Sequence, residues 1–192
     1  MRSGKHSPGK EDVMRINRMA SVVLPSALLF ALSAPTVSMA QTATSDDKAF
    51  VKDAIEGGNA EVELGQLAEQ RAVNDDVKAF GKKMVDDHTQ LGEQMKTVAG
   101  QIGVTPPKMI PPMDKALEVK LKMLSGDDFD QAYIKAMVKD HEQDLAAFKK
   151  ETAQGSSPAA KSAAEQGEQV ISSHLVMIRQ LAQAHNINTA GL

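Results

Sequence analysis

The chain has 192 residues, no cysteine and only 3% aromatic residues. That length fits one domain with an adequate core, and the lack of cysteine excludes disulfides, thiolate metal sites, thiol catalysis and a lipid-modified N-terminal cysteine. With a formal net charge of −3 and no basic cluster, the chain is a poor candidate for nucleic-acid binding.

The N-terminus is organised like a secretory signal. Arg15 and Arg18 precede an apolar run at 22–32, and a small-x-small site ends at Ala40. The run is about half the length that a membrane-spanning helix needs. We therefore predict that residues 1–40 are a cleaved signal peptide, with an uncleaved anchor as the alternative.

Cleavage would leave an acidic protein outside the inner membrane. Residues 1–40 hold five of the 22 basic and two of the 25 acidic residues, so the remaining chain has a formal charge of −6. We expect it to be periplasmic and to contain no transmembrane span. Met14 is a second candidate for the true start of the chain.

The rest of the chain predicts an all-α fold, because helix-forming residues dominate and no stretch alternates like a strand. Apolar residues recur at helical spacing in four long segments, 46–72, 75–101, 125–154 and 158–185. Helix caps are expected at Ser45, Asn74 and Ser157, and at Ser125 through a capping box with Asp128. Residues 186–192 are expected to form a frayed tail.

The segment 103–126 separates the second and third long helices. Its two Pro-Pro pairs rule out a continuous helix, although a short helix around 114–124 is plausible. A connection of this length can cross the height of a bundle and leave the two flanking helices parallel. We therefore predict a ferritin-like four-helix bundle over residues 44–185 with a long Pro-containing crossover.

Two adjacent glycines interrupt the first helix. Gly57 and Gly58 each cost about 1 kcal/mol relative to alanine in a helix interior. We expect them to mark a close helix approach or a local bend beside Glu61.

Each long helix carries an ionisable side chain on its apolar face near its midpoint: Glu61, His88, His141 and His174. A residue at mid-helix lies at mid-height whichever way its helix runs. We therefore expect these four groups to meet in one layer of the core, with Asp144 as a further nearby carboxylate.

The sequence also resembles a known family. The segments EGGNAEVELGQLA (56–68), VKAFGKKMVDDH (77–88), LSGDDFDQAYIKAMVKDHEQDL (124–145) and HLVMIRQLA (174–182) are similar to bacterial secreted proteins grouped as domain of unknown function 4142. The resemblance covers nearly all of 44–185. It implies a ferritin-like fold, a secretory address and a metal-related ancestry, and it implies no reaction. Such proteins are often labelled membrane or outer-membrane proteins.

The predicted layer has two interpretations. Neutral imidazoles and a carboxylate on facing helices suit one zinc, iron, manganese or copper ion, with Glu61, His88, His141, His174 and Asp144 as candidate ligands. Alternatively, these side chains bond only to one another and fix the register of the helices. The first interpretation gives a metal-binding protein, and the second a structural or interaction module of the cell envelope.

A di-iron centre is not expected. Ferritin-like di-iron sites use Glu-x-x-His motifs on two helices, whereas valine stands at 85 and 138, three residues before His88 and His141. A metal-dependent oxidoreductase remains a further alternative, but a binding protein is favoured over an enzyme. Envelope association and a homo-oligomer are both compatible with the sequence.

Asp87 and Asp140 each precede a histidine directly. Neighbours in a helix point about 100° apart, so we do not expect either aspartate to share an ion with the histidine that follows it. They could instead orient a histidine of another helix, or remain solvated.

Overall fold

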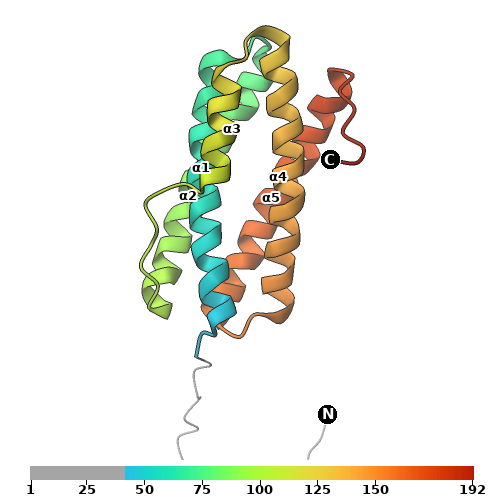
Figure 1. Cartoon of the computed structure of the whole chain (residues 1–192). Coiled ribbons are helices and arrows are strands. Elements are labelled where there is room, and N and C mark those ends of the chain that lie inside the picture. The colour runs from blue at the N-terminus through green and yellow to red at the C-terminus, as the bar shows by residue number, and fades with distance from the viewer. Residues whose placement is uncertain (1–41) are drawn as a thin grey trace, which may run out of the picture. The chain divides into compact units, whose positions relative to one another are not determined.

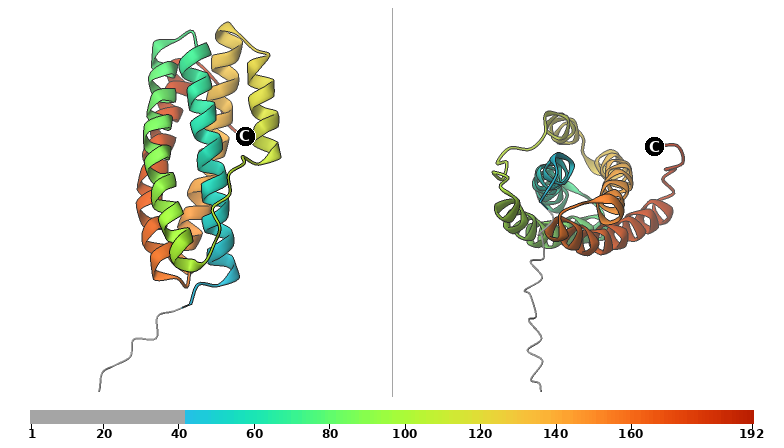
Figure 2. Two further views of the ribbon diagram at one scale, coloured as in Figure 1. Left: turned by 90° about the vertical axis from the view of Figure 1, so that its left-hand side faces the viewer. Right: turned by 90° about the horizontal axis from the view of Figure 1, so that it is seen from below.

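A computed structural model describes residues 42–192, in which all regular secondary structure is helical. The helices are α1 (Ser45–Arg71), α2 (Asp75–Ile102), α3 (Pro112–Lys122), α4 (Gly126–Gln154) and α5 (Pro158–Ala184). The four long helices form the bundle, and the short α3 lies outside it (Figures 1 and 2). The predicted all-α bundle is confirmed.

The bundle consists of two antiparallel pairs, α1 with α2 and α4 with α5 (Figure 1). Contacts of α2 with α5 and of α1 with α4 join the pairs. The connection between α2 and α3 returns along the bundle toward the end where α2 begins, so that α2 and α4 run in the same direction (Figure 1). This is the single-crossover arrangement expected from the segment 103–126.

Helix α3 is attached to one end of the bundle. It contacts α1 and α4 beside the end of α1 and the start of α4 (Figure 1). Leu121 is fully buried against the core, and Glu118 forms ion pairs with Lys115 and Lys122 of the same helix. The short α3 extends along only part of the length of α1 and α4 (Figure 1).

The helix starts correct three predicted caps. Thr44, and not Ser45, caps α1, because its side chain and the Asp47 side chain three residues later form a capping box. Asn74 precedes α2 and Ser125 precedes α4, but no side-chain bond caps either helix, so the predicted capping box with Asp128 is absent. Ser157 caps α5 as expected, through its hydroxyl and the backbone N–H of Ala160.

Two buried aspartates hold the loops at opposite ends of the bundle. Asp47 accepts hydrogen bonds from the backbone N–H groups of Ser156 and Ser157 in the α4–α5 loop. Asp130 accepts from two backbone N–H groups and one side chain in the α1–α2 loop, those of Val73 and Asn74. Each carboxylate thereby fixes a loop between two helices to a third helix.

The predicted signal at 1–40 lies outside the described residues. In the tail, the backbone N–H of Ile187 donates to the carbonyl of Ala182, and the Ile187 side chain packs on the core, whereas residues 190–192 are exposed. No helix within 42–192 has the length and apolar character of a membrane span.

Helices α1 and α2 approach each other closely at Gly65 and Gly81. A Cβ atom on Gly65 would lie 2.7 Å from the carbonyl oxygen of Gly81. Gly57 and Gly58 face open space instead, with nothing within 4 Å of an added Cβ. Of the two alternatives predicted for Gly57 and Gly58, the close helix approach is therefore wrong, and a close contact lies two turns further along α1.

This difference predicts opposite effects of the same substitution. We expect Gly65→Ala to lower the free energy of unfolding by about 2 kcal/mol, because the added methyl group forces two backbones apart. Gly58→Ala is the matched control and should raise it by about 0.5–1 kcal/mol through its helix preference alone. Urea denaturation of both variants measures the two changes, and equal effects would contradict the close contact.

Candidate metal centre

A polar layer divides the apolar core into two clusters. One cluster surrounds Phe129 and Tyr133, and the other surrounds Ile55 and Met95. Between them lie four side chains, one from each long helix and none more than 2% exposed: Glu61 from α1, His88 from α2, His141 from α4 and His174 from α5. The structure thus brings the four mid-helix groups together, and we call them the polar layer.

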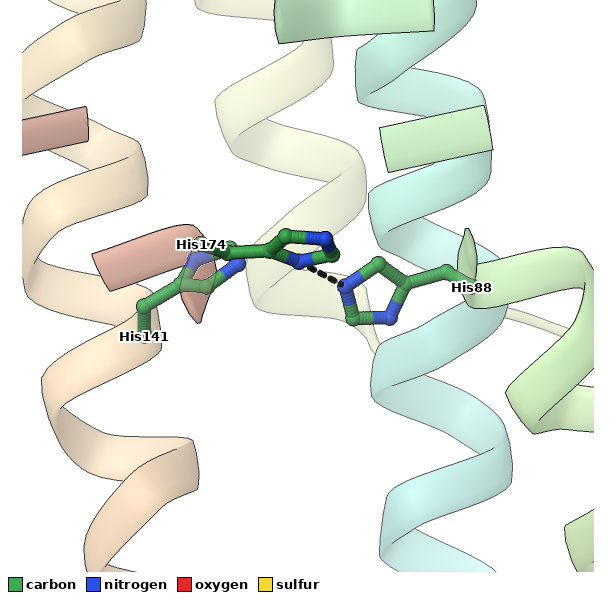
Figure 3. A group of neighbouring side chains, drawn as sticks. All are labelled: His88, His141 and His174. Atoms are coloured by element: carbon green, nitrogen blue, oxygen red, sulfur yellow. Dashed lines mark hydrogen bonds between the residues drawn. The ribbon is translucent and has the colours of Figure 1, made fainter. Parts of the chain in front are cut away.

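A hydrogen bond joins two of the histidines. His88 Nε2 lies 3.2 Å from His174 Nδ1, and the rings of His88, His141 and His174 face a shared space (Figure 3). All three rings offer a nitrogen, and these nitrogens lie within 4.8 Å of one another. The three side chains are therefore close enough to bind one ion.

The outer nitrogens of these rings contact oxygen atoms of the protein. His174 Nε2 lies 2.7 Å from Asp87 Oδ2, and His88 Nδ1 lies 2.7 Å from Glu61 Oε2. His141 Nδ1 donates to the backbone carbonyl of Met137 at 2.9 Å. Asp87 thus has the orienting contact with another helix that its sequence position suggested, and Lys83 holds it in place through a 2.8 Å ion pair.

One pair of atoms in the polar layer lacks partners. His141 Nε2 and Glu61 Oε1 are buried without a hydrogen bond and lie 3.5 Å apart. Because Nδ1 of His141 donates to Met137, its Nε2 carries a lone pair. A lone pair and a carboxyl oxygen that face each other in an apolar core are costly unless a cation or proton lies near both.

Burial keeps the imidazoles neutral. Desolvation lowers the pKa of His141 to about 3 and is also the main reason why the pKa values of His88 and His174 fall to about 4. Phe80 adds apolar surface, with its ring 6.2 Å from that of His174 and 6.4 Å from that of His141. Neutral imidazole is the form that binds metal ions.

Carboxyl groups gather beside Glu61. Burial raises the pKa of Glu61 well above its usual value, and the negative charges of Asp140 and Asp114 add to this effect. Burial likewise raises the pKa of Asp140 to about 6 and that of Asp144 well above its usual value. This crowding of carboxylates favours a proton or a cation in their midst.

No sequence pattern indicated Asp114, whose charge acts on Glu61. The sequence also did not indicate that Asp140 and His141 would lie close to the same carboxylate. Asp140 offers a donor atom within 4.8 Å of donors on Glu61 and His141, although it directly precedes His141. A separation of about 100° on α4 still lets both side chains reach the Glu61 carboxylate on α1. Asp144, a predicted ligand, lines a cleft with Glu61 but belongs to neither group of candidate donors found among residues 42–192.

Tyr133 is a further buried group near this layer. Its side chain is fully buried, its hydroxyl lacks a hydrogen-bond partner, and its ring stacks on Phe129. Burial, followed by the charge of Glu61, raises the pKa of Tyr133. The apolar helical position of this residue gave no signal of anything beyond core packing.

Comparison with known proteins agrees with this fold. Residues 32–181 match the family described as Domain of unknown function (DUF4142). No curated protein matches the sequence. Structural similarity therefore provides the remaining information.

Three solved structures have a similar fold. A DUF305 fragment from Deinococcus radiodurans matches with a TM-score of 0.67 and 15% identity, over 74% of this chain and 99% of its own. A DUF305 protein from Streptomyces coelicolor, provisionally described as secreted, has a TM-score of 0.66 and 14% identity, over 77% and 96%.

The third is a two-domain protein from Anabaena variabilis with DJ-1/ThiJ/PfpI-like and ferritin-like domains. Its TM-score is 0.57 at 12% identity, over 78% of this chain and 40% of that protein. Identities this low establish the fold alone, and the predicted ferritin-like fold is confirmed.

Proposed function

We propose a function for this chain, which belongs to the DUF4142 family: it binds one transition metal ion through His88, His141 and His174. Three imidazoles favour zinc, copper or iron over manganese, which prefers oxygen ligands. We further propose that the protein acts after secretion, as its N-terminal sequence and the description of the Streptomyces coelicolor protein suggest.

The hydrogen-bond pattern of the three rings carries this proposal. A metal-bound histidine usually donates its second N–H to a carboxylate or a backbone carbonyl. The acceptors available to such N–H groups are Glu61 for His88, Asp87 for His174 and the Met137 carbonyl for His141. If all three outer nitrogens donate, the inner nitrogens carry lone pairs, and the ion would then replace the hydrogen bond between His88 Nε2 and His174 Nδ1.

The distance between two of the inner nitrogens, which is also that of a hydrogen bond, fits a tetrahedral ion. Metal–nitrogen bonds of 2.0–2.1 Å at a tetrahedral angle separate two ligand atoms by about 3.3 Å. His88 Nε2 and His174 Nδ1 are 3.2 Å apart. Three protein ligands would leave the fourth position open, as in catalytic zinc sites, and an oxidoreductase is therefore retained as the second alternative.

Glu61 is better placed to orient His88 than to bind the ion. The two nitrogens of an imidazole point to opposite sides of the ring. A carboxylate 2.7 Å from Nδ1 of His88 therefore lies across the ring from an ion on Nε2. The competing ligand set is Glu61, Asp140 and His141, whose donor atoms also lie within 4.8 Å of one another.

A layer without metal is the competing explanation. The contacts of His88 with His174 and Glu61 could stabilise the bundle by themselves. His141 Nε2 and Glu61 Oε1 then need a proton between them. The raised pKa of Glu61 allows such a proton, so metal content decides between the two explanations.

The proposal is tested by the metal content of the purified protein. We expect about one equivalent of metal per chain, and none in a His141→Ala variant. His185→Ala is the control, because His185 pairs with Asp76 in the last turn region of α5, away from the polar layer. Elemental analysis after dialysis measures all three proteins, and a wild-type protein that cannot be loaded with zinc, copper or iron would refute the proposal.

A further inference from the structure

A cleft of about 560 Å³ leads from one end of the bundle to the polar layer. Its outer part is lined by the start of α1, including Thr44, and by the end of α4, including Gln154. Its inner part reaches Glu61 and His88. The lining residues of the outer part come from the end of the bundle where α1 starts and α4 ends, and α3 lies toward the opposite end (Figure 1).

Carboxyl groups outnumber basic groups in the walls of this cleft. One lysine, Lys150, and six carboxyl side chains line it: Asp46, Asp47, Asp53, Glu61, Asp144 and Glu151. Burial raises the pKa values of Glu61, Asp144 and Glu151 and so favours their neutral forms, which leaves Asp46, Asp47 and Asp53 to provide the negative charge of the outer part. Low-dielectric walls lined by one sign of charge concentrate ions of the opposite sign and raise their rate of association. The electrostatics of the cleft therefore favour cations over anions.

Two buried carboxyl oxygens along the cleft lack hydrogen-bond partners. Glu151 Oε1 belongs to a residue that is 6% exposed, and Glu61 Oε1 to one that is 1% exposed. An unpartnered oxygen in such a position is costly unless a cation, proton or water can reach it. These atoms mark an outer and an inner position along one path.

We infer that this acidic cleft is the route by which a hydrated divalent cation reaches the polar layer. The inference rests on the proposed function, because a route needs a destination. Cations gather at the mouth near Asp46, pass Asp53 and Asp144, and reach Glu61 and His88, the two members of the polar layer that line the cleft.

Gly57 provides the width that this route needs. It lines the cleft one turn before Glu61, and an added Cβ would have nothing within 4 Å. Gly58 is equally free of neighbours but does not line the cleft. The helix cost of two adjacent glycines is therefore explained at position 57 by the open path, and position 58 provides a matched control.

The steric test compares Gly57→Leu with Gly58→Leu in protein stripped of metal by a chelator. Both variants gain helix preference, but only leucine at 57 fills the path. We expect Gly57→Leu to slow the association of Co²⁺ by about tenfold, because binding then waits for the side chain to move. Gly58→Leu should bind at the wild-type rate. Stopped-flow absorbance of the bound Co²⁺ measures the rates, and its amplitude measures the amount bound.

The electrostatic test compares two pairs of exposed aspartates. Asp46→Asn with Asp53→Asn removes two charges from the cleft, and Asp127→Asn with Asp128→Asn removes two at the other end of the bundle. We expect the first pair alone to slow Co²⁺ association by about tenfold at low ionic strength, with an unchanged amplitude.

The outcomes separate the route from the metal centre. Slow association in Gly57→Leu and in the Asp46/Asp53 variant, with full amplitude, supports the route. Wild-type rates in both variants with full amplitude overturn the route and leave the centre intact. A wild-type protein that binds no Co²⁺, zinc, copper or iron overturns both.

Discussion

His174→Ala is expected to abolish tight metal binding, whereas Glu61→Gln weakens it by about 10- to 100-fold and keeps one ion per chain. The first substitution removes one of three proposed ligands. The second replaces the carboxyl group that lies 2.7 Å from His88 Nδ1 with an amide and preserves a side chain of the same shape. The unequal losses follow from placing His174 in contact with the ion and Glu61 behind His88.

Competition titration against a coloured chelator measures both affinities. Glu69→Gln, a substitution at an exposed position of the same helix, is the control and should leave the affinity unchanged. The opposite ranking, with binding lost in Glu61→Gln and kept in His174→Ala, would favour Glu61, Asp140 and His141 as the ligands.

Asp47→Ala is expected to lower the free energy of unfolding by about 3 kcal/mol, because several buried or half-buried donors lose a charged acceptor. These donors are the backbone N–H groups of Ser156 and Ser157 and the N–H and hydroxyl of Thr44. Asp46→Ala removes the neighbouring exposed charge and should cost only about 0.5 kcal/mol through the helix dipole.

The effect of Asp47 should also depend on pH. Burial acts to raise the pKa of Asp47, but the hydrogen bonds from Thr44, Ser157 and Ser156 outweigh it and hold the pKa well below its usual 3.8. The stabilisation is therefore complete above about pH 4 and is lost as the pH falls further. Urea denaturation between pH 7 and pH 3 should show the gap between wild type and Asp47→Ala narrowing, and a constant gap would contradict a charged acceptor.

The helices and the polar layer were predictable because both depend on local periodicity. The sequence places His88, His141 and His174 on the apolar faces of their helices, and mid-helix position fixes their height. The crossover followed from the Pro-Pro pairs, since proline prevents one long helix.

The contacts among these groups could not be predicted, because they depend on how the helices rotate against one another. The position of Asp140 beside Glu61 is an interhelical distance, and the residue next to a histidine on its own helix gives no sign of it. Gly65 and Gly81 meet for the same reason, although Gly57 and Gly58 looked more prominent in the sequence. Asp140 and Asp144 are four residues apart and so lie on one face of α4. This spacing was the one signal in the sequence that carboxyl groups gather on that face.

The two helical pairs divide the proposed centre between them. Glu61, Asp87 and His88 come from the pair α1–α2, and His141 and His174 come from the pair α4–α5. An ion held by all three histidines would therefore cross-link two halves of the chain that are otherwise joined by the crossover and by side-chain packing. If the chain were cleaved within the exposed part of that crossover, the ion would bind to both resulting peptides. The association of the two peptides would then depend on the concentration of metal.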